Sequence, residues 1–238
     1  MQKKTLFSLL LLLCFKTIFC QEKTKNSLSN WYDSEIGNHN LAVNNGRLFN
    51  DVYPTNKKTN RYFEDEKFLI GEVLFDNQYY NSICINYDLF EDALLIKPYS
   101  EKDRNALILI KKRNESFIFK GKKFVNLNYN DAIKNDNVNG YYEEVLTNNS
   151  FQFYVKHKKS KREIFAENKV IYEYELRKEY YLFYKSNFHK VDSKNSITKL
   201  FPELKTQINN FFLQNNKSFE ADRASFMKNL FNYINGLQ

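Results

Sequence analysis

The sequence is poor in the residues on which most recognisable chemistry depends. It contains three cysteines, three histidines, three prolines and six glycines in 238 residues. Cys14 and Cys20 lie within the first twenty residues, so a chain that begins at Gln21 retains Cys84 alone, which excludes an intramolecular disulfide. Cys84 lies in an alternating segment typical of a strand, and this favours a small packed side chain over a reactive thiol.

The few histidines and glycines fall in no pattern that binds a metal or a phosphate. His39, His157 and His189 are far apart, and no HxH, HExxH or CxxC segment occurs. The scattered glycines form neither a GxGxxG nor a Walker loop, and no Gly-x-Ser-x-Gly elbow is present. The sequence therefore predicts no metal, no cofactor and no catalytic residue.

The longest apolar run stands at the amino terminus. Lys3 and Lys4 precede an apolar stretch over residues 6–15, which Lys16 interrupts. A spanning helix needs roughly 20 apolar residues, so this run is too short to be a membrane anchor. The basic start, apolar centre and polar end predict a secretory signal peptide over residues 1–20, with no transmembrane segment in the mature chain.

We expect cleavage before Gln21 and an exported, periplasmic or outer-membrane-associated protein. The alternative is a lipoprotein with its lipid on Cys20, although Ile18 and Phe19 differ from the small residues that a lipidation signal places before its cysteine. Loss of the three lysines in residues 1–20 lowers the formal net charge from +8 to +5. This mild excess on an exported chain argues against nucleic acid as a partner.

The pattern along the chain predicts four segments. After the signal peptide, residues 21–60 are polar and predict a loosely ordered segment. Residues 61–192 alternate between polar and apolar side chains in short runs, which is typical of an antiparallel β domain. Residues 193–238 change to helical spacing and predict a helical segment docked on that domain. The predicted fold class is mainly β (α+β), a hairpin meander forming a sandwich or a partly closed barrel with two C-terminal amphipathic helices.

Asparagine, aspartate and glycine mark the hairpin turns. Turns are predicted at residues 76–77, 120–122 and 148–149, because Asn and Gly adopt positive φ more readily than other residues. Further strands are predicted over residues 170–176 and 180–184.

Two helices are predicted after residue 193. The first begins near Pro202, which a first helical turn tolerates, and carries an apolar face of Leu204, Ile208, Phe211 and Phe212. The second ends at Gly236 and carries an apolar face of Phe226, Met227, Leu230, Tyr233 and Ile234. Each face needs a partner, so we expect both helices to pack on the β domain.

Two groups of carboxylates are candidates for acid and base chemistry. Asp88, Glu91 and Asp92 lie in one turn, and Glu143 and Glu144 lie in one strand. Such pairs can cleave a glycosidic bond. Aspartate is also common in turns because it hydrogen-bonds its own backbone, and this structural explanation is favoured here.

One short segment is strongly basic. We expect it to contact an anion or a partner through Lys156, His157, Lys158, Lys159, Lys161 and Arg162. The alternative is a solvated hairpin end whose lysines discourage pairing between sheet edges.

Tyrosine occurs in doublets, at residues 79–80, 141–142 and 180–181. Neighbouring side chains on a strand face opposite sides, so one ring of each doublet points outward. An outward ring can serve recognition, and a structural role is the alternative.

The segment over residues 71–88 resembles an uncharacterised family of exported proteins common in Bacteroidota. In that family a strand, an Asp-Gly turn and a tyrosine lead into a strand that ends in Tyr-Asp, and this chain has Asn77 where the family usually has glycine. The likeness continues at Lys123–Val125, Gly140–Leu146 and Ser196–Phe212. The resemblance implies an exported envelope protein of strands and helices, and it implies no activity or catalytic residue.

The leading functional hypothesis is a non-catalytic envelope protein with a binding or scaffold role. Its expected partner is another envelope protein or an anionic glycan. One alternative is a carbohydrate-active or other hydrolase whose dispersed site uses Asp88, Asp92 or Glu144. Another is a secreted effector or inhibitor.

Overall fold

The structure is a computed structural model, and it describes residues 41–53, 55, 58–98, 105–129, 138–166 and 168–237. The signal peptide predicted over residues 1–20 lies outside the described residues, as do residues 21–40 of the predicted loose segment. The structure describes most of residues 41–60 of that segment. The 3-10 helix η2 (Ala42–Asn44) and strand β1 (Gly46–Leu48) lie in it, and Val43 is fully buried.

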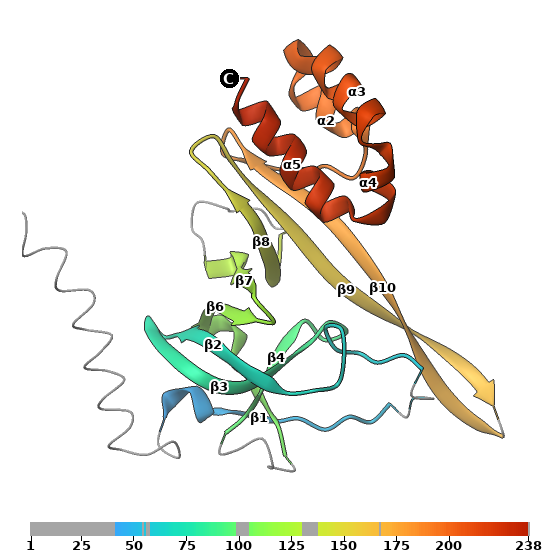
Figure 1. The fold of residues 1–238 in the computed structure, drawn as a ribbon. Helices are drawn as coiled ribbons and strands as arrows, with labels where there is room; N and C mark the ends of the chain where they lie inside the picture. The colour runs from blue at the N-terminus through green and yellow to red at the C-terminus, as the bar shows by residue number, and fades with distance from the viewer. Residues whose placement is uncertain are drawn as a thin grey trace, which may run out of the picture.

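The described residues form one open antiparallel sheet (Figure 1). Its further strands are β2 (Leu69–Phe75), β3 (Gln78–Asp88), β4 (Ala93–Lys97), β5 (Leu107–Leu109), β6 (Asn114–Phe119), β7 (Lys122–Asn126), β8 (Tyr141–Thr147), β9 (Phe151–Ala166), β10 (Lys169–Tyr184) and β11 (Asn187–Lys190). The eleven strands lie in the order β1-β5-β4-β3-β2-β6-β7-β8-β9-β10-β11. Most neighbours in space are neighbours in sequence, so the predicted mainly β meander is confirmed.

The sheet curls without closing. Tyr87 of β3 packs against Tyr141 of β8 with ring centroids 5.8 Å apart. Strands β2, β6 and β7 lie between them in the sheet, so this contact requires strong curvature. The rings of Phe117 and Phe124 stack in the same interior at 4.9 Å. The predicted alternatives of a sandwich and a partly closed barrel both agree with this open, curled sheet.

The hairpin turns lie where the sequence predicts them, although the turn between Thr147 and Gln152 forms without the positive φ expected at Asn148 or Asn149. Asp76 and Asn77 both have positive φ, at 51° and 59°, and join β2 to β3. Lys120 and Gly121 do the same between β6 and β7, with φ of 52° and 72°. Two consecutive positive φ angles match the twist of the flanking strands, which is why such turns close tight hairpins.

Strands β9 and β10 are much longer than predicted. They pair without interruption from Phe151↔Tyr184 to Ala166↔Lys169 and form a long two-stranded hairpin (Figure 1). The separate strands predicted over residues 170–176 and 180–184 are one strand. The prediction of a hairpin end at residues 156–162 was also wrong, because these residues lie inside β9 and the turn comes after residue 166.

Four short helices follow β11, not two. They are α2 (Lys194–Leu200), α3 (Lys205–Gln214), α4 (Asn216–Ala221) and α5 (Arg223–Asn235). Ser193 caps α2, and Phe201 ends it because the following Pro202 disfavours helical φ and ψ at the residue before it. Pro202 begins the 3-10 helix η5 (Pro202–Leu204), and Asp222 caps α5 through the N–H groups of Ala224 and Ser225.

Two large apolar clusters fill the molecule. The first core lies inside the curled sheet and includes Val73, Phe75, Tyr87, Phe117 and Phe124. The second core lies between the long hairpin and the helices and includes Phe151, Phe153, Ile208, Leu230 and Phe231. The predicted docking of the helices is therefore confirmed.

No helix in the described ranges is both long enough and apolar enough to cross a bilayer.

Candidate functional site

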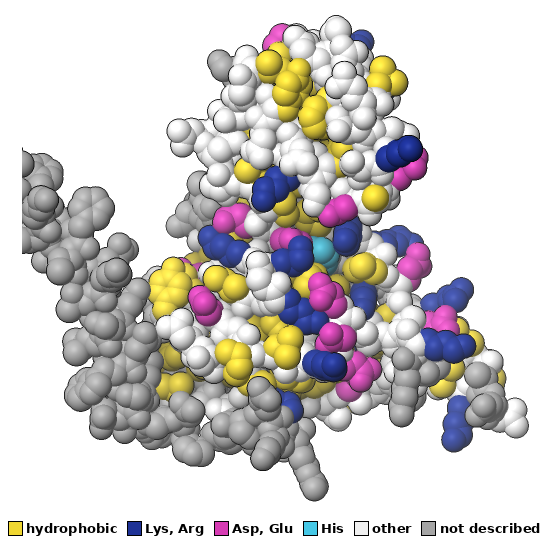
Figure 2. Space-filling view, viewed as in Figure 1, with side chains coloured by type: hydrophobic (Ala, Val, Ile, Leu, Met, Phe, Trp, Pro, Cys, Tyr) yellow, Lys and Arg dark blue, Asp and Glu magenta, His cyan; other side chains and the backbone are white. Residues whose placement is uncertain are grey.

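A groove of about 1050 Å³ lies where α4 and the first turns of α5 meet the sheet. We call it the helix–sheet groove, and its lining comes from the β6–β7 turn, from β7, β8, β9 and β10, and from α4 and α5. Its charged and histidine residues are Lys122, Lys123, Glu143, Glu144, His157, Lys178, Glu220, Asp222, Arg223 and Lys228. Figure 2 shows charged side chains of both signs gathered at this waist of the molecule, around histidine.

Two of the lysines in the groove are neutralised by carboxylates from β8. Lys122 Nζ lies 2.5 Å from Glu143 Oε1, and Lys123 Nζ lies 2.9 Å from Glu144 Oε1. Because β7 and β8 are neighbours, these pairs cross two adjacent strands and fix the wall of the groove.

The other three basic side chains have no such partner. Within the described ranges, no carboxylate lies within ion-pair distance of Lys178, Arg223 or Lys228. The Arg223 guanidinium lies over the rings of Phe219 and Tyr180, at 4.5 Å and 5.7 Å from their centroids. These aromatic contacts hold Arg223 in place without neutralising its charge. The groove lining thus carries five basic side chains against the four carboxylates Glu143, Glu144, Glu220 and Asp222, a formal excess of one positive charge, and Asp222 offsets part of the field of Lys178.

His157 forms a buried pair with Glu143 at the base of the groove. His157 is 4% exposed, and its Nε2 lies 2.6 Å from Glu143 Oε2. Burial alone would raise the pKa of Glu143, but hydrogen bonds from His157 and Lys122 outweigh it and lower the pKa. Glu143 is therefore an anion at neutral pH, and we assign the proton to His157 Nε2.

The second ring nitrogen of His157 has no partner among the described residues. Burial lowers the pKa of His157 more than the neighbouring Glu143 raises it, so the ring is neutral at neutral pH. With Nε2 as the donor, Nδ1 is an acceptor, and in the described part of the chain no donor reaches this buried atom. A buried polar atom without a partner costs free energy, so Nδ1 remains available to accept a hydrogen bond.

A smaller hollow of about 340 Å³ lies on the other side of His157. It shares Lys122, His157 and Lys178 with the groove. Phe63 lines it as well, and its ring meets the imidazole edge-on at 5.2 Å. The His157 side chain therefore lines both the helix–sheet groove and the smaller hollow.

The structure separates the members of the predicted basic run. Neighbouring residues of a strand face opposite sides, so the run does not form one patch. His157 lines both the groove and the smaller hollow, and Lys159 joins it in the smaller hollow. Lys159 Nζ donates to the carbonyl oxygens of Asn60 and Tyr62 at 2.8 Å and 2.7 Å.

The outer members of the run lie along the long hairpin and have partners of their own. Lys158 pairs with Glu179 at 2.8 Å, and Arg162 pairs with Glu173 at 3.0 Å, each across the β9–β10 register. Lys161 Nζ lies 3.5 Å from the centroid of the Tyr53 ring. Each of these side chains therefore already interacts with another residue of the protein, which leaves less of its charge for a ligand.

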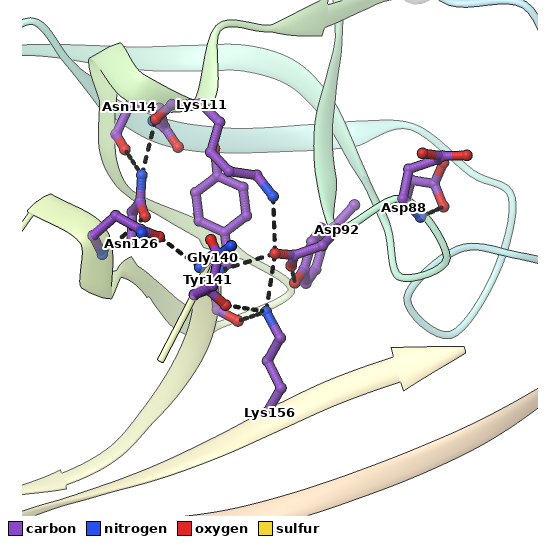
Figure 3. Close-up of polar contacts among 12 residues, drawn as sticks. Asp88, Asp92, Lys111, Asn114, Asn126, Gly140, Tyr141 and Lys156 are labelled. Carbon is purple, nitrogen blue, oxygen red and sulfur yellow. Dashed lines mark hydrogen bonds and ion pairs between the residues drawn. The ribbon is translucent and has the colours of Figure 1, made fainter. Parts of the chain in front are cut away.

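Lys156 is buried and takes part in a cluster around Asp92 (Figure 3). Lys156 and Lys111 each place Nζ 2.9 Å from Asp92 Oδ2, and the Tyr87 hydroxyl donates to Oδ1 at 2.5 Å. Burial lowers the pKa of Lys156 to about 8, although Asp92 opposes the shift. Gly140 has φ of +82°, and a Cβ there would lie 1.7 Å from Asp92 Oδ2, so the cluster requires glycine.

Asp88 belongs to a different cluster, and Figure 3 shows it apart from Asp92. Asp88 is fully buried and accepts from Arg61, whose Nη2 lies 2.6 Å from Oδ2. Arg61 also pairs with Asp51 at 3.0 Å. Burial alone would lower the pKa of Arg61, but the hydrogen bond to Asp88 and its charge outweigh burial and raise the pKa. The structure thus does not bring Asp88 and Asp92 together as an acid and a base.

Sequence reasoning missed the pairing of Glu143 with His157 and the three unpaired cations. The turn at residues 148–149 was a usable signal for the first, because it pairs Thr147 with Gln152 and brings residues near 143 opposite those near 156. A bulge after Glu144 shifts this register by one residue, which the sequence does not show. Lys178, Arg223 and Lys228 meet only through tertiary packing.

In the described ranges, no group of three or more His, Cys, Asp and Glu side chains is placed to hold a metal ion. A comparison with known protein families, curated proteins and solved structures found no match. The resemblance to exported Bacteroidota proteins stays a prediction, and the function has to be argued from the site itself.

Proposed function

We propose that this protein is a non-catalytic, exported binding protein of the cell envelope that holds an anionic ligand in the helix–sheet groove. The observation that carries the proposal is the set of three basic side chains, Lys178, Arg223 and Lys228, that line the groove without a carboxylate partner in the described ranges. The anionic glycan expected from the sequence belongs to this class of ligand.

The groove favours an anion for two physical reasons. A concave site bordered by low-dielectric walls focuses the field of its charges, so unpaired cations there attract an anion more strongly than lysines on open surface. Hydrogen bonds between an ammonium or guanidinium group and an anionic oxygen are also stronger than neutral ones. The pairs of Lys122 and Lys123 with β8 carboxylates keep the wall rigid and leave the other cations for the ligand.

Calorimetric titration with inorganic pyrophosphate and with sulfate tests this proposal. We expect binding that weakens as sodium chloride is raised, because salt screens exposed charge. Lys178→Gln and Lys228→Gln should each weaken pyrophosphate binding by roughly threefold to tenfold, which corresponds to about 0.7–1.4 kcal/mol. Neither side chain has a hydrogen-bond partner within the described residues, so both variants should fold normally.

Lys217→Gln is the matched control, because Lys217 is an exposed lysine of α4 that does not line the groove. It should bind pyrophosphate as the parent protein does. Absence of binding by the parent protein, or equal losses in the control and groove variants, would contradict the proposal.

The exported location is tested separately. Mass spectrometry of the protein recovered from a fractionated envelope should give a chain that begins at Gln21. A diacylglyceryl group on Cys20 would replace this part of the proposal with the lipoprotein alternative.

One observation favours catalysis as a second candidate function. Glu143 orients His157 through Nε2, and the free Nδ1 is an acceptor beside the groove, as a general base requires. Release of reducing ends from an acidic oligosaccharide by the parent protein, and its loss in His157→Asn, would establish turnover in place of simple binding.

A further inference from the structure

The helix–sheet groove continues onto the outer face of the sheet. A second hollow of about 460 Å³ lies there, and we call it the tyrosine hollow. It is lined by Leu74, Tyr79, Glu115, Ser116, Lys123, Val125, Asn126, Leu127, Tyr129, Glu144, Gln152 and Tyr154. Lys123 and Glu144 line both the groove and the hollow, so their ion pair forms the rim between the two.

The floor of the tyrosine hollow is a continuous row across neighbouring strands. The register places Leu74 of β2 opposite Tyr79 of β3 and opposite Ser116 of β6. Ser116 in turn faces Val125 of β7. The residues next to this row, such as Phe117 and Phe124, point into the first core, so the row itself faces outward.

This outward face is apolar and aromatic, and at one end of it Leu127 and Tyr154 are buried in a third, smaller apolar cluster against which Val125 packs. The solvent side of an antiparallel sheet is normally polar, whereas this row contains leucine, valine and tyrosine. Tyr79 is 47% exposed and Tyr129 is 40% exposed, and both line the hollow. Large exposed rings at the edge of a concave face are a common feature of recognition surfaces.

Polar groups surround the rings. Gln152 accepts from the Tyr154 hydroxyl through Oε1, and its amide N–H groups have no partner in the described part of the chain. Glu115 uses Oε1 to accept from the N–H of Asn77 and has a second carboxylate oxygen available. The hollow therefore combines flat apolar rings with hydrogen-bond donors and acceptors.

A sugar ring matches this combination. Its C–H bonds form an apolar face that packs on a tyrosine ring, and its hydroxyl groups donate and accept around the edge. A small inorganic anion matches only the groove, and an apolar ligand leaves the polar groups around the rings without partners. The rim of Lys123 and Glu144 allows one extended ligand to occupy both places.

We infer that the ligand is an acidic oligosaccharide, with its anionic groups in the helix–sheet groove and further sugar rings on Tyr79 and Tyr129. The inference rests on the proposed anion binding in the groove. It adds the class of ligand and a second contact surface for it.

The test compares three probes of stated chemistry on the full chain. These are inorganic pyrophosphate, an oligogalacturonate and a neutral cello-oligosaccharide of the same length. We expect the parent protein to bind oligogalacturonate more tightly than either other probe. Tyr79→Ala and Tyr129→Ala should each weaken oligogalacturonate binding by roughly tenfold, while pyrophosphate binding stays unchanged.

Phe165→Ala is the matched control, because Phe165 is 81% exposed on the long hairpin and lines neither the helix–sheet groove nor the tyrosine hollow. It should change the binding of no probe. A melting curve and a circular dichroism spectrum of each variant verify the fold. Shifts of the Tyr79 and Tyr129 ring resonances on addition of oligogalacturonate to the parent protein give a readout that does not depend on variants.

The outcomes separate the two proposals. If Lys178→Gln weakens oligogalacturonate binding but the tyrosine variants and resonances are unaffected, the inference is wrong and the proposed anion binding stands. Tyrosine-dependent binding of the neutral oligosaccharide as tight as that of oligogalacturonate overturns the acidic class. Failure of both anionic probes to bind overturns the proposed function and the inference with it.

Discussion

The two cores of this protein are built in different ways. The first core lies inside the curled sheet, where curvature brings Tyr87 of β3 against Tyr141 of β8, and Val43 and Phe63 complete it from outside the strands. The second core exists only where helices cover β9 and β10, and Phe231 of α5 packs there against Phe151 and Phe153, with centroids 5.6 Å and 5.1 Å away. A sheet can thus supply one interior by curling and still depend on another layer for the rest of its apolar surface.

The cores also differ in their charges. Arg61, Asp88 and Lys156 are buried on the side of the first core, each with partners of opposite charge. In the described ranges, by contrast, the helices that cover the second core contribute no buried charged side chain. The two cores should therefore be destabilised by different substitutions. Loss of packing should destabilise both cores, whereas an uncompensated buried charge should destabilise the first core only.

Removal of residues 193–238 should have the largest effect. It strips the helical half from the second core and exposes Phe151, Phe153 and Leu182 to water. The loss should exceed the net stability of a typical domain, about 5–15 kcal/mol, and abolish cooperative unfolding. Thermal denaturation followed by circular dichroism measures this. A truncated chain that melts as the full chain does would show that the sheet is independent of its helices.

Truncation of one buried ring in either core should lower the free energy of unfolding by a similar amount, but the loss of amide protection should fall in different strands and helices. Phe231→Ala and Phe117→Ala each remove a ring that is at most 1% exposed, and each should cost about 3–5 kcal/mol in urea denaturation. Hydrogen exchange should then show loss of protection in α5 and β9 for the first variant and in β2, β6 and β7 for the second. Equal losses everywhere would mean that the two cores unfold as one unit.

Arg61→Met should expose the electrostatic weakness of the first core. Asp88 is fully buried, and without Arg61 it becomes a buried charge with no cationic partner, which typically costs about 3–5 kcal/mol. The further change Asp88→Asn should recover part of the loss because it removes the charge. Lys123→Gln breaks a half-exposed pair and serves as the control, with an expected cost of about 0–1 kcal/mol.

The smallest effect is the contribution of Lys156 to the pH dependence of stability. Its pKa is about 8 when folded, against 10.5 for the ordinary side chain, so between these values the unfolded chain binds more protons. Stability should therefore rise with pH across this window, by at most about 1.4 kcal/mol per pH unit from this group. Lys156→Met should lack that rise when urea midpoints are compared from pH 8 upward. Parallel profiles for both proteins would contradict the shift.

Much of the fold could be predicted because its signals are local. The turns at residues 76–77 and 120–122 depend on the φ angles of two residues each, and the sequence shows those residues directly. The length of β9 and β10 could not be predicted from periodicity. Charged residues such as Lys158 and Glu179 interrupt the apolar pattern there, and they are strand residues only because they pair with each other across the register.

The candidate site was less accessible to sequence reasoning. The basic run drew attention to His157, but its role depends on Glu143 and on which ring nitrogen has a partner. The unpaired cations Lys178 and Arg223 come from a strand and from a helix that are distant in sequence, and only their packing makes a groove. A count of charges cannot reveal which of them are already neutralised.

The order of strands in the sheet also implies an order of events during folding. Eight of the ten pairings join strands that are consecutive in the chain, and the long hairpin alone accounts for sixteen paired positions. Contacts of this kind close short loops and form early, whereas β1–β5 and β2–β6 join distant segments and require larger loops to close. We therefore expect the β9–β10 hairpin to gain amide protection first in pulsed hydrogen exchange during refolding, with β1 last, and protection of β1 before the hairpin would reverse this sequence of steps.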